Sequence, residues 1–395
     1  MMDEVFGVER LCKAFDEVIA GMRCPPTLGV RQREQMRMRV RRLKKDKLRI
    51  IAGIVEDYSK FGTVHFSSFT TRVPKRVRGA RERLISVFPV RQRVVQRSML
   101  ETLWPFVEPI VVPSVCHCTF RRGGLHPRRG IAEAVSVVST ARDRRPYFFK
   151  TDIEAFFDSV DRKKLNAIVR SLIPDERFCG LVRAVVEAER RIDHQWIKEG
   201  DLADNCGVPQ GCTLSPLLAC TYLSSFDSNV RSRNINMIRY VDDILVICDS
   251  FQDASSVKAI IQETLSNEYS LNLSEQKTSI IAPDEVIEFL GHSVDPDGVV
   301  RPTKERLNTI RAWVFAIVDE LPGRSDAGVI SDLSSYLLGF FISMRHCDFT
   351  QDDFMNFGAL IGDALQNRGL DRNRLSKGLR LFSNKWPPGF LRGLP

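Results

Sequence analysis

The chain has 395 residues, of which 43% are hydrophobic and 27% charged, a composition that is ordinary for a globular protein. Its length suits two or three subdomains around a continuous core. With 58 Lys and Arg against 49 Asp and Glu, the formal charge of +9 is compatible with a polyanionic partner. The first residues lack a long apolar run, and no stretch approaches about 18 consecutive apolar residues, which argues against a signal peptide and a membrane span. We therefore expect a reduced, cytoplasmic protein without a membrane partner.

Basic residues are concentrated in two runs near the amino terminus. Residues 31–50 hold ten Lys or Arg against two acids, and residues 72–97 hold nine against Glu82 alone. A single run of this kind is as often a solvated helix face as a binding surface. Two runs in one quarter of the chain favour a nucleic-acid-binding surface.

The hydrophobic pattern predicts a basic amino-terminal part, a central mixed α/β part and a helical carboxy-terminal part. The predicted strands are 61–70, 147–153, 237–241 and 244–248, with a hairpin at 286–300 that turns at Pro296-Asp297-Gly298. The predicted helices are 91–109, 130–143, 159–173 with Ser159 as its cap, 175–191 and 255–269, followed by helical sequence from Thr303.

The ten cysteines are scattered along the chain, and only Cys116 and Cys118 form a tight pair. No Cys-x-x-Cys pair recurs, and no cluster of His and Cys has the spacing of a zinc site. The sequence therefore predicts no structural zinc.

Two adjacent acids, Asp242 and Asp243, lie between two apolar strands and are expected at the turn of a hairpin. A polar hairpin tip is the ordinary explanation, but this pair lacks the glycine that two-residue turns prefer. A third acid, Asp152, ends another apolar strand. Carboxylates at the ends of neighbouring strands can meet at one edge of a sheet, where they raise one another's pKa unless a cation neutralises them. Two Mg²⁺ ions roughly 3.5–4 Å apart serve in this way in nucleotidyl transfer.

Five ordered motifs resemble the palm motifs of reverse transcriptases. They are "KTDIEAFFDSVD" (150–161), "GVPQGCTLSPLLACTYL" (207–223), "YVDD" (240–243), "LNLSEQKTSII" (271–281) and "EFLGHSV" (288–294). Upstream, "RERLISVFPVRQRVVQ" and "CTFRRGG" resemble finger segments of the bacterial enzymes of the group II intron and retron kind. The resemblance covers roughly residues 70–300.

The resemblance implies an α+β fold of the right-hand polymerase type. Its fingers and palm combine an antiparallel sheet with helices, and its thumb is helical. We expect a basic helical extension over residues 1–70, fingers and palm over 71–302, and the thumb with the carboxy-terminal region over 303–395. The implied activity is RNA-directed DNA polymerisation with two Mg²⁺ ions, or Mn²⁺ in their place, on an RNA template with deoxynucleotides as substrates and DNA as product.

The family's metal ligands correspond to Asp152 and Asp242, with Asp243 as the third acid and the carbonyl of Ile153 as a further ligand. Lys277 corresponds to the lysine proposed to protonate the leaving pyrophosphate, although a lone lysine is usually a surface charge.

Further family roles fall on nucleotide-contacting positions. Phe157 corresponds to the aromatic that rejects ribonucleotides, with plain core packing as the alternative. Gln210 and Gly211 match the loop that packs against the incoming nucleotide, and Tyr240 would lie near the primer terminus. The best candidates for triphosphate contacts are Lys75 and Arg83. Relatives carry Asp where this chain has Gln92, which weakens the alignment of the finger segment.

About 90 residues follow the last motif and its hairpin, and the sequence shows no endonuclease module, no Val-Thr-Gly tripeptide of the retron kind and no RNase H or protease segment. These departures from known subclasses favour a compact, stand-alone bacterial enzyme that resembles the defence-associated group, which often copies a dedicated non-coding RNA. A retron or intron-type retroelement enzyme is the alternative. An RNA-dependent RNA polymerase and a non-catalytic nucleic-acid-binding relic are the rival classes, although Tyr-Val-Asp-Asp with Phe157 argues against the first and the intact acids against the second. A homo-oligomer and an effector protein from a neighbouring gene are left open as partners.

Overall fold

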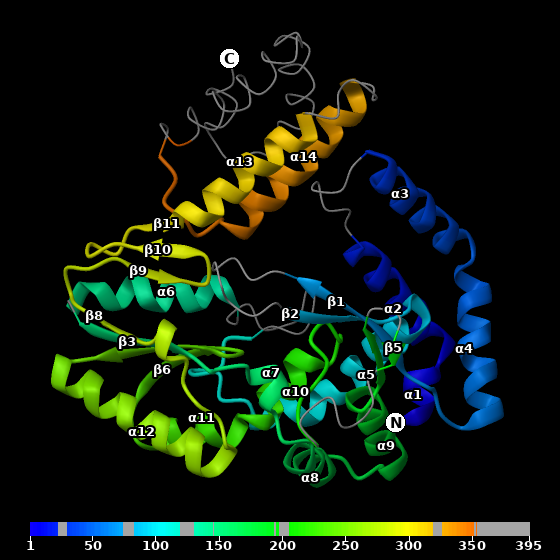
Figure 1. The fold of residues 1–395 in the computed structure, drawn as a ribbon, viewed down its shortest axis with the longest axis horizontal. Coiled ribbons are helices and arrows are strands. Elements are labelled where there is room, and N and C mark those ends of the chain that lie inside the picture. Colours follow the sequence, from blue (N-terminus) through cyan, green and yellow to red (C-terminus); the bar gives the residue numbers. More distant parts are fainter. Residues whose placement is uncertain are drawn as a thin grey trace. The chain divides into compact units, whose positions relative to one another are not determined.

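The computed structural model describes two compact units, each taken by itself below (Figure 1). The first comprises residues 1–22, 40–131 and 146–282, and the second comprises residues 23–39, 132–145 and 283–395. The described residues are 1–22, 30–73, 83–118, 130–144, 146–192, 195–196, 205–318, 326–350 and 353. The boundaries expected at residues 70 and 302 stay predictions.

The first unit contains a helical layer in which α2 (Val8–Gly21) packs against α4 (Lys47–Phe61) and α5 (Val90–Val107). The short α1 (Met2–Phe6) joins it, with the Phe6 ring stacked on Tyr58 at a centroid distance of 3.8 Å. Helix α5 ends close to its predicted end, and the η1 turn (Glu108–Ile110) follows it. The basic run of the sequence is helical too, since it forms α3 (Val30–Lys45) and the start of α4.

A four-stranded sheet follows, in the order β2-β1-β4-β5. Its strands are β1 (Ser67–Val73), β2 (Arg83–Val87), β4 (Glu189–Ile192) and β5 (Gln195–Trp196). The predicted helix over 175–191 is too long, because α9 (Glu176–Val186) stops before Glu189 and the chain then pairs in parallel with β1. Tertiary pairing overrides local helix preference here.

The second sheet of this unit is antiparallel throughout, in the order β6-β7-β3-β8. Its strands are β3 (Tyr147–Asp152), β6 (Asn236–Tyr240), β7 (Asp243–Cys248) and β8 (Ser279–Ile281). Helix α12 (Phe251–Tyr269) packs across β3, β7 and β8, while α11 (Ser224–Ser232) packs against β6 (Figure 1). Short apolar runs predict β3, β6 and β7, and the structure confirms all three.

Helix α8 (Arg162–Leu172) begins later than the sequence predicts. Ser159 belongs to the short helix α7 (Phe156–Ser159), and its hydroxyl donates to the carbonyl of Ala155. The cap is Asp161, whose carboxylate accepts from the Lys164 N–H at 3.0 Å. The predicted Ser159 cap is therefore wrong: both residues suit a cap, but Val160 and Asp161 are extended and pair with residues 205–207, so α8 begins after Asp161.

The second unit holds α6 (Ile131–Ala141), the three-stranded sheet β11-β10-β9 and two apolar helices. Strands β9 (Ile287–Phe289), β10 (His292–Val294) and β11 (Val300–Pro302) form two hairpins where the sequence predicts one, and Gly298 occupies the predicted turn with φ of +81°. Helices α13 (Lys304–Val318) and α14 (Asp326–Ser343) share a core and stack Trp313 on Tyr336.

The predicted α+β class is thereby confirmed, with helices packed on largely antiparallel sheets. Helix α10 (Ser215–Tyr222) packs against α5, α8 and α11. Among the residues that the structure describes, no helix is long and apolar enough to cross a membrane.

Candidate active site

Three carboxylates meet at the edge of the β6-β7-β3-β8 sheet. Asp152 is the last residue of β3, and its Cα partner across the antiparallel pair is Asp243, the first residue of β7. Asp242 precedes it in the hairpin turn, and carboxylate oxygens of the three acids lie within 4.8 Å of one another. The strand register thus brings together residues that are 90 positions apart in the sequence. We call these residues the carboxylate cluster.

The turn itself differs from the expected one by a single residue. Tyr240 pairs with Asp243, so the two loop residues are Val241 and Asp242 rather than the two acids. Val241 has φ of +62°, a left-handed conformation that a β-branched side chain rarely adopts. Residues held in this way cost about 1–3 kcal/mol and persist only where their surroundings fix them.

Hydrogen bonds fix this turn from several directions. The Arg239 guanidinium donates to the Val241 carbonyl at 2.8 Å, and the Val241 N–H donates to the Cys118 sulfur at 3.1 Å. The Ile153 N–H donates to the Asp242 carbonyl at 3.1 Å, which ties the turn to the end of β3. The strained residue is therefore held on both its amide and its carbonyl side.

Arg239 is itself completely buried and is held by Asp227 of α11. Its Nε donates to Asp227 Oδ1 at 2.7 Å, and its Nη2 forms a second bond with Oδ2 of the same carboxylate. Such a bidentate pair satisfies both charges, which isolated burial would heavily penalise. Sequence analysis missed this pair, whose only signal is one Arg in an otherwise apolar strand.

The carboxylate cluster is short of positive charge. Burial, with the charges of Asp152 and Asp243, raises the pKa of Asp242 to about 7. Burial and the charge of Asp152 raise the pKa of Asp243 to about 6. The Lys277 ammonium lies 2.5 Å from Asp152 and balances one of the three acids. A set of three hard carboxylate oxygens fits a divalent cation of the Mg²⁺ or Mn²⁺ class.

Lys277 reaches Asp152 from the η4 turn (Glu275–Lys277) just before β8. The carbonyl of Asp152 accepts from the Ser274 N–H at 2.8 Å. The hydroxyls of Thr151 and Thr278 form a hydrogen bond at 2.7 Å. These contacts place the lysine at the carboxylates although half of its side chain is exposed.

The loop that holds Gln210 and Gly211, here called the Gln-Gly loop, lies between α7 and β2. The Val208 N–H donates to the carbonyl of Phe157 at 2.7 Å, and the Ser86 N–H donates to the carbonyl of Gln210 at 2.6 Å. Gly211 has φ of +95°, and a Cβ added there would lie 2.6 Å from the Ser86 carbonyl oxygen. Only glycine fits so close an approach.

The remaining predicted residues take different positions. Phe157 is half-buried beside the fully packed Phe156, with ring centroids 5.6 Å apart. Tyr240 is half-buried at the end of β6. Arg83 is exposed at the start of β2, in the other sheet, and Lys75 lies outside the described residues.

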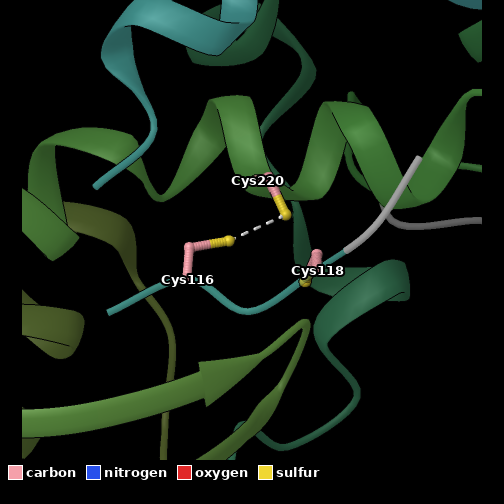
Figure 2. Close-up of side chains that lie close together, drawn as sticks. All are labelled: Cys116, Cys118 and Cys220. Carbon is pink, nitrogen blue, oxygen red and sulfur yellow. Dashed lines mark hydrogen bonds between the residues drawn. The ribbon is translucent and has the colours of Figure 1, made fainter. Parts of the chain in front are cut away.

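A second cluster went unpredicted. Figure 2 shows Cys116 and Cys118, from the segment after α5, facing Cys220 of α10. Their sulfurs lie within 4.8 Å of one another, and all three residues are buried. We call them the cysteine cluster. Hydrogen bonds from the other two thiols, aided by the Arg239 charge, hold the pKa of Cys116 well below its usual range. Sequence spacing reveals the Cys116 and Cys118 pair but not the distant Cys220.

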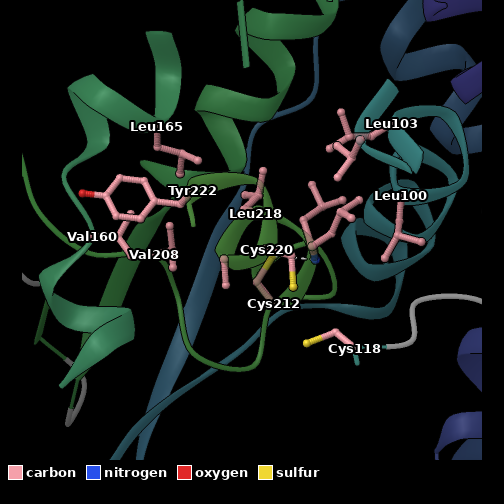
Figure 3. Close-up of a cluster of buried hydrophobic side chains, with 14 of the residues drawn as sticks. Leu100, Leu103, Cys118, Val160, Leu165, Val208, Cys212, Leu218, Cys220 and Tyr222 are labelled. Carbon is pink, nitrogen blue, oxygen red and sulfur yellow. Dashed lines mark hydrogen bonds between the residues drawn. The ribbon is translucent and has the colours of Figure 1, made fainter. Parts of the chain in front are cut away.

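Apolar side chains surround this cluster. Leu100 and Leu103 of α5 and Leu218 of α10 lie near the sulfurs, with Tyr222 further along α10 (Figure 3). All of these residues are buried, so the cysteine cluster belongs to the hydrophobic core of the first unit rather than to its surface.

Comparison with known proteins gives a consistent classification. Residues 73–294, more than half of the chain, match the family described as "Reverse transcriptase (RNA-dependent DNA polymerase)". The chain belongs to the reverse transcriptase family. This match includes the carboxylate cluster, Lys277 and the Gln-Gly loop.

Curated relatives share limited identity with the chain. Protein YkfC of Escherichia coli is 26% identical over 251 residues, covering 53% of this chain and 62% of that protein. The group II intron-encoded protein LtrA of Lactococcus lactis is 21% identical over 266 residues, covering 51% and 42%. The chain thus spans less than two thirds of either relative. Among solved structures, apo telomerase from Candida tropicalis is similar with a TM-score of 0.49 at 12% identity, covering 89% of this chain and 68% of that one.

Replacing Asp227 with Ala should destabilise the first unit by about 3–5 kcal/mol, because the buried Arg239 loses its partner. The free energy of unfolding in urea measures the loss. The double variant Asp227→Ala/Arg239→Met should lose less than the sum of the single variants. Glu176→Ala, which breaks the exposed pair with Arg170, should cost about 0–1 kcal/mol and serves as the control. Equal losses for Asp227→Ala and Glu176→Ala would contradict the assignment.

Proton competition should make Mg²⁺ binding depend on pH. The pKa values of Asp242 and Asp243 are raised in the folded state. Their protonated forms therefore stabilise the metal-free fold, and this contribution is fully present below about pH 4. It is lost as the pH rises through about 6 to 7. Metal requires the ionised forms, so its apparent affinity should rise at least roughly tenfold between about pH 6 and pH 8. Thermal shift against Mg²⁺ concentration measures this change. An affinity independent of pH, or an equal rise in Asp242→Asn, would refute it.

Proposed function

We propose that the chain is a cytoplasmic RNA-directed DNA polymerase that copies an RNA template into DNA from deoxynucleotides. The observation that carries this proposal is the carboxylate cluster on neighbouring strand ends, within the part of the chain that matches the reverse transcriptase family. The described cysteines are all free thiols, which suits a reducing compartment.

The carboxylate cluster and the carbonyl of Ile153 are proposed to hold two Mg²⁺ ions, with Mn²⁺ as a substitute. When bound, such ions activate the primer hydroxyl and stabilise the charge on the leaving group. Lys277 would leave Asp152 and give its proton to the leaving pyrophosphate. The short ion pair that it forms with Asp152 supports this role, because it places the ammonium beside the carboxylates.

The nucleotide is proposed to lie between α7 and the Gln-Gly loop. Gln210 and Gly211 would contact its base and sugar, and Phe157 would pack against C2′. Tyr240, beside the acids, would contact the primer terminus. Lys75 and Arg83 are proposed to bind the triphosphate, since both side chains suit phosphate oxygens.

RNA binding is proposed for the exposed face of α3. Arg39, Arg41, Arg42, Lys44 and Lys45 are all exposed there. Arg37, by contrast, is engaged by Asp332. A row of exposed cations on one helix suits a phosphate backbone.

The central test of this function is a primer-extension assay on an RNA template with Mg²⁺. Asp152→Asn and Asp242→Asn should each reduce incorporation by at least about a thousandfold, because an amide cannot replace an anionic ligand. Both variants should remain folded, since relief of repulsion offsets the lost contacts. Asp249→Asn, in the loop after β7, is the control and should keep full activity. Full activity in either site variant would refute the metal assignment.

Phe157→Val should admit ribonucleotides while reducing deoxynucleotide use only slightly. A ring against C2′ leaves no room for a hydroxyl, and overpacking of about 1–3 kcal/mol corresponds to roughly ten- to a hundredfold discrimination. The ratio of kcat/KM for the two sugars measures it. Phe156→Ala, which empties a buried site, should lower stability without changing that ratio. A wild-type preference for ribonucleotides would instead favour an RNA polymerase.

The double variant Arg41→Gln/Lys44→Gln should bind RNA more weakly and with a flatter salt dependence. Each lost phosphate contact lowers the log–log slope by roughly 0.7–0.9, so two contacts remove about 1.4–1.8. Lys163→Gln/Lys258→Gln makes the same change of charge on exposed positions of α8 and α12 and should leave the slope unchanged. Equal slopes for both variants and wild type would assign α3 to the solvated surface.

Two biological settings are proposed for this activity. Antiphage defence, with a dedicated non-coding RNA as template, rests on the resemblance to stand-alone bacterial enzymes. A retroelement role is supported by similarity to LtrA, which is named as a group II intron-encoded protein. Sequencing of nucleic acid that copurifies with the chain distinguishes a dedicated RNA from intron RNA, and the neighbouring genes would reveal an effector partner.

A further inference from the structure

The cysteine cluster has the dimensions of a metal-thiolate site. Cys116 and Cys220 place their sulfurs 3.5 Å apart, and all three sulfurs lie within 4.8 Å of one another (Figure 2). A metal with bonds of about 2.3 Å to sulfur in tetrahedral geometry separates its ligands by about 3.8 Å. A disulfide requires about 2.05 Å. The observed spacing is therefore nearer to that of metal ligands than to that of a disulfide.

Main-chain pairing holds these ligands in place. The Cys116 segment runs beside β6, with the His117 N–H donating to the Arg239 carbonyl at 2.9 Å and the Arg239 N–H donating to the Val115 carbonyl at 2.8 Å. Cys220 is fixed in helix α10. Two separate parts of the chain thus present sulfur to one point without any rearrangement of the backbone.

In the metal-free protein burial holds the pKa of Cys220 well above its usual range, and the hydrogen bond with Cys116 raises the pKa of Cys118, so these thiols lose their protons as the ion enters. The Val241 N–H donates to Cys118 Sγ at 3.1 Å, an outer hydrogen bond of the kind that orients metal ligands. The charge of Arg239 lies close to Cys116 and offsets part of the negative charge. The apolar side chains around the cluster exclude water, which would compete for the ion.

We propose that Cys116, Cys118 and Cys220 bind one soft metal cation of the d¹⁰ class, Zn²⁺ or Cu⁺. Thiolates select these ions, and each thiol releases its proton to solvent as the ion enters. Within the described part of the chain the cluster offers three sulfurs, a set that suits Cu⁺, whereas structural Zn²⁺ takes a fourth ligand. The ion joins the segment that holds Cys116 and Cys118, next to the Val241 turn, to helix α10. Its role is therefore structural and not part of the transfer reaction.

Metal content of the full chain tests this proposal independently of polymerase activity. The protein, purified without oxygen and stripped with a chelator, is incubated with Zn²⁺ alone or with Cu⁺ alone, desalted and analysed by mass spectrometry for both metals. Wild type should retain about one equivalent in one of the two arms, and that arm identifies the ion. Retention in neither arm, or isolation of a Cys116–Cys220 disulfide from the oxygen-free protein, would overturn the proposal.

Single substitutions locate the ion. Cys116→Ala and Cys220→Ala should each retain at least about tenfold less metal, since a ligand is lost. Cys179→Ala removes another buried thiol, in α9, and should retain as much as wild type. Metal kept by Cys116→Ala would also overturn the assignment. Thermal unfolding of wild type provides a measurement that needs no variant: the retained ion should raise the midpoint of unfolding, and a chelator should remove that gain.

Discussion

The buried pair between Arg239 and Asp227 is the interaction on which the candidate site depends. It joins strand β6 to helix α11 and, through one further hydrogen bond, supports a turn that its own sequence disfavours. A left-handed valine would relax if this support were absent. The carboxylate of Asp242, the next residue in the turn, then would not be held beside Asp152, whereas Asp243 is held there by strand pairing. Burying a charge usually costs stability, and here the buried guanidinium donates a hydrogen bond to the carbonyl of Val241 in the turn.

A second constraint is repulsion within the carboxylate cluster. Three acids share an edge of the sheet, and burial raises the pKa of Asp242 and Asp243 even though the charges of Lys277 and Lys150 act in the opposite direction. At this edge, buried like charges lie close together, which lowers stability. In the rest of the sheet, apolar side chains such as Phe148 and Phe149 are completely buried, which raises it. Conflicts of this kind are expected where function resides.

The sequence allowed prediction of the elements whose signal is local. Short apolar runs predicted β3 and the β6–β7 hairpin, and acids at the strand ends predicted that Asp242 and Asp243 meet Asp152. Features that depend on distant partners could not be predicted in this way. The strand at Glu189 exists because β1 is beside it, and Asp161 rather than Ser159 caps α8 because residues 160–162 pair with residues 205–207. Likewise, nothing local to Cys220 or Asp227 indicates the residue that each one meets across the core.

The close approach of Gly211 to Ser86 has a mechanical consequence. The loop backbone touches β2 with no side chain between them, and the Ser86 N–H is hydrogen-bonded to the Gln210 carbonyl at 2.6 Å. Because the two backbones are in direct contact, no flexible side chain between them could absorb a displacement of β2. The position of the Gln-Gly loop is therefore set directly by the backbone of β2.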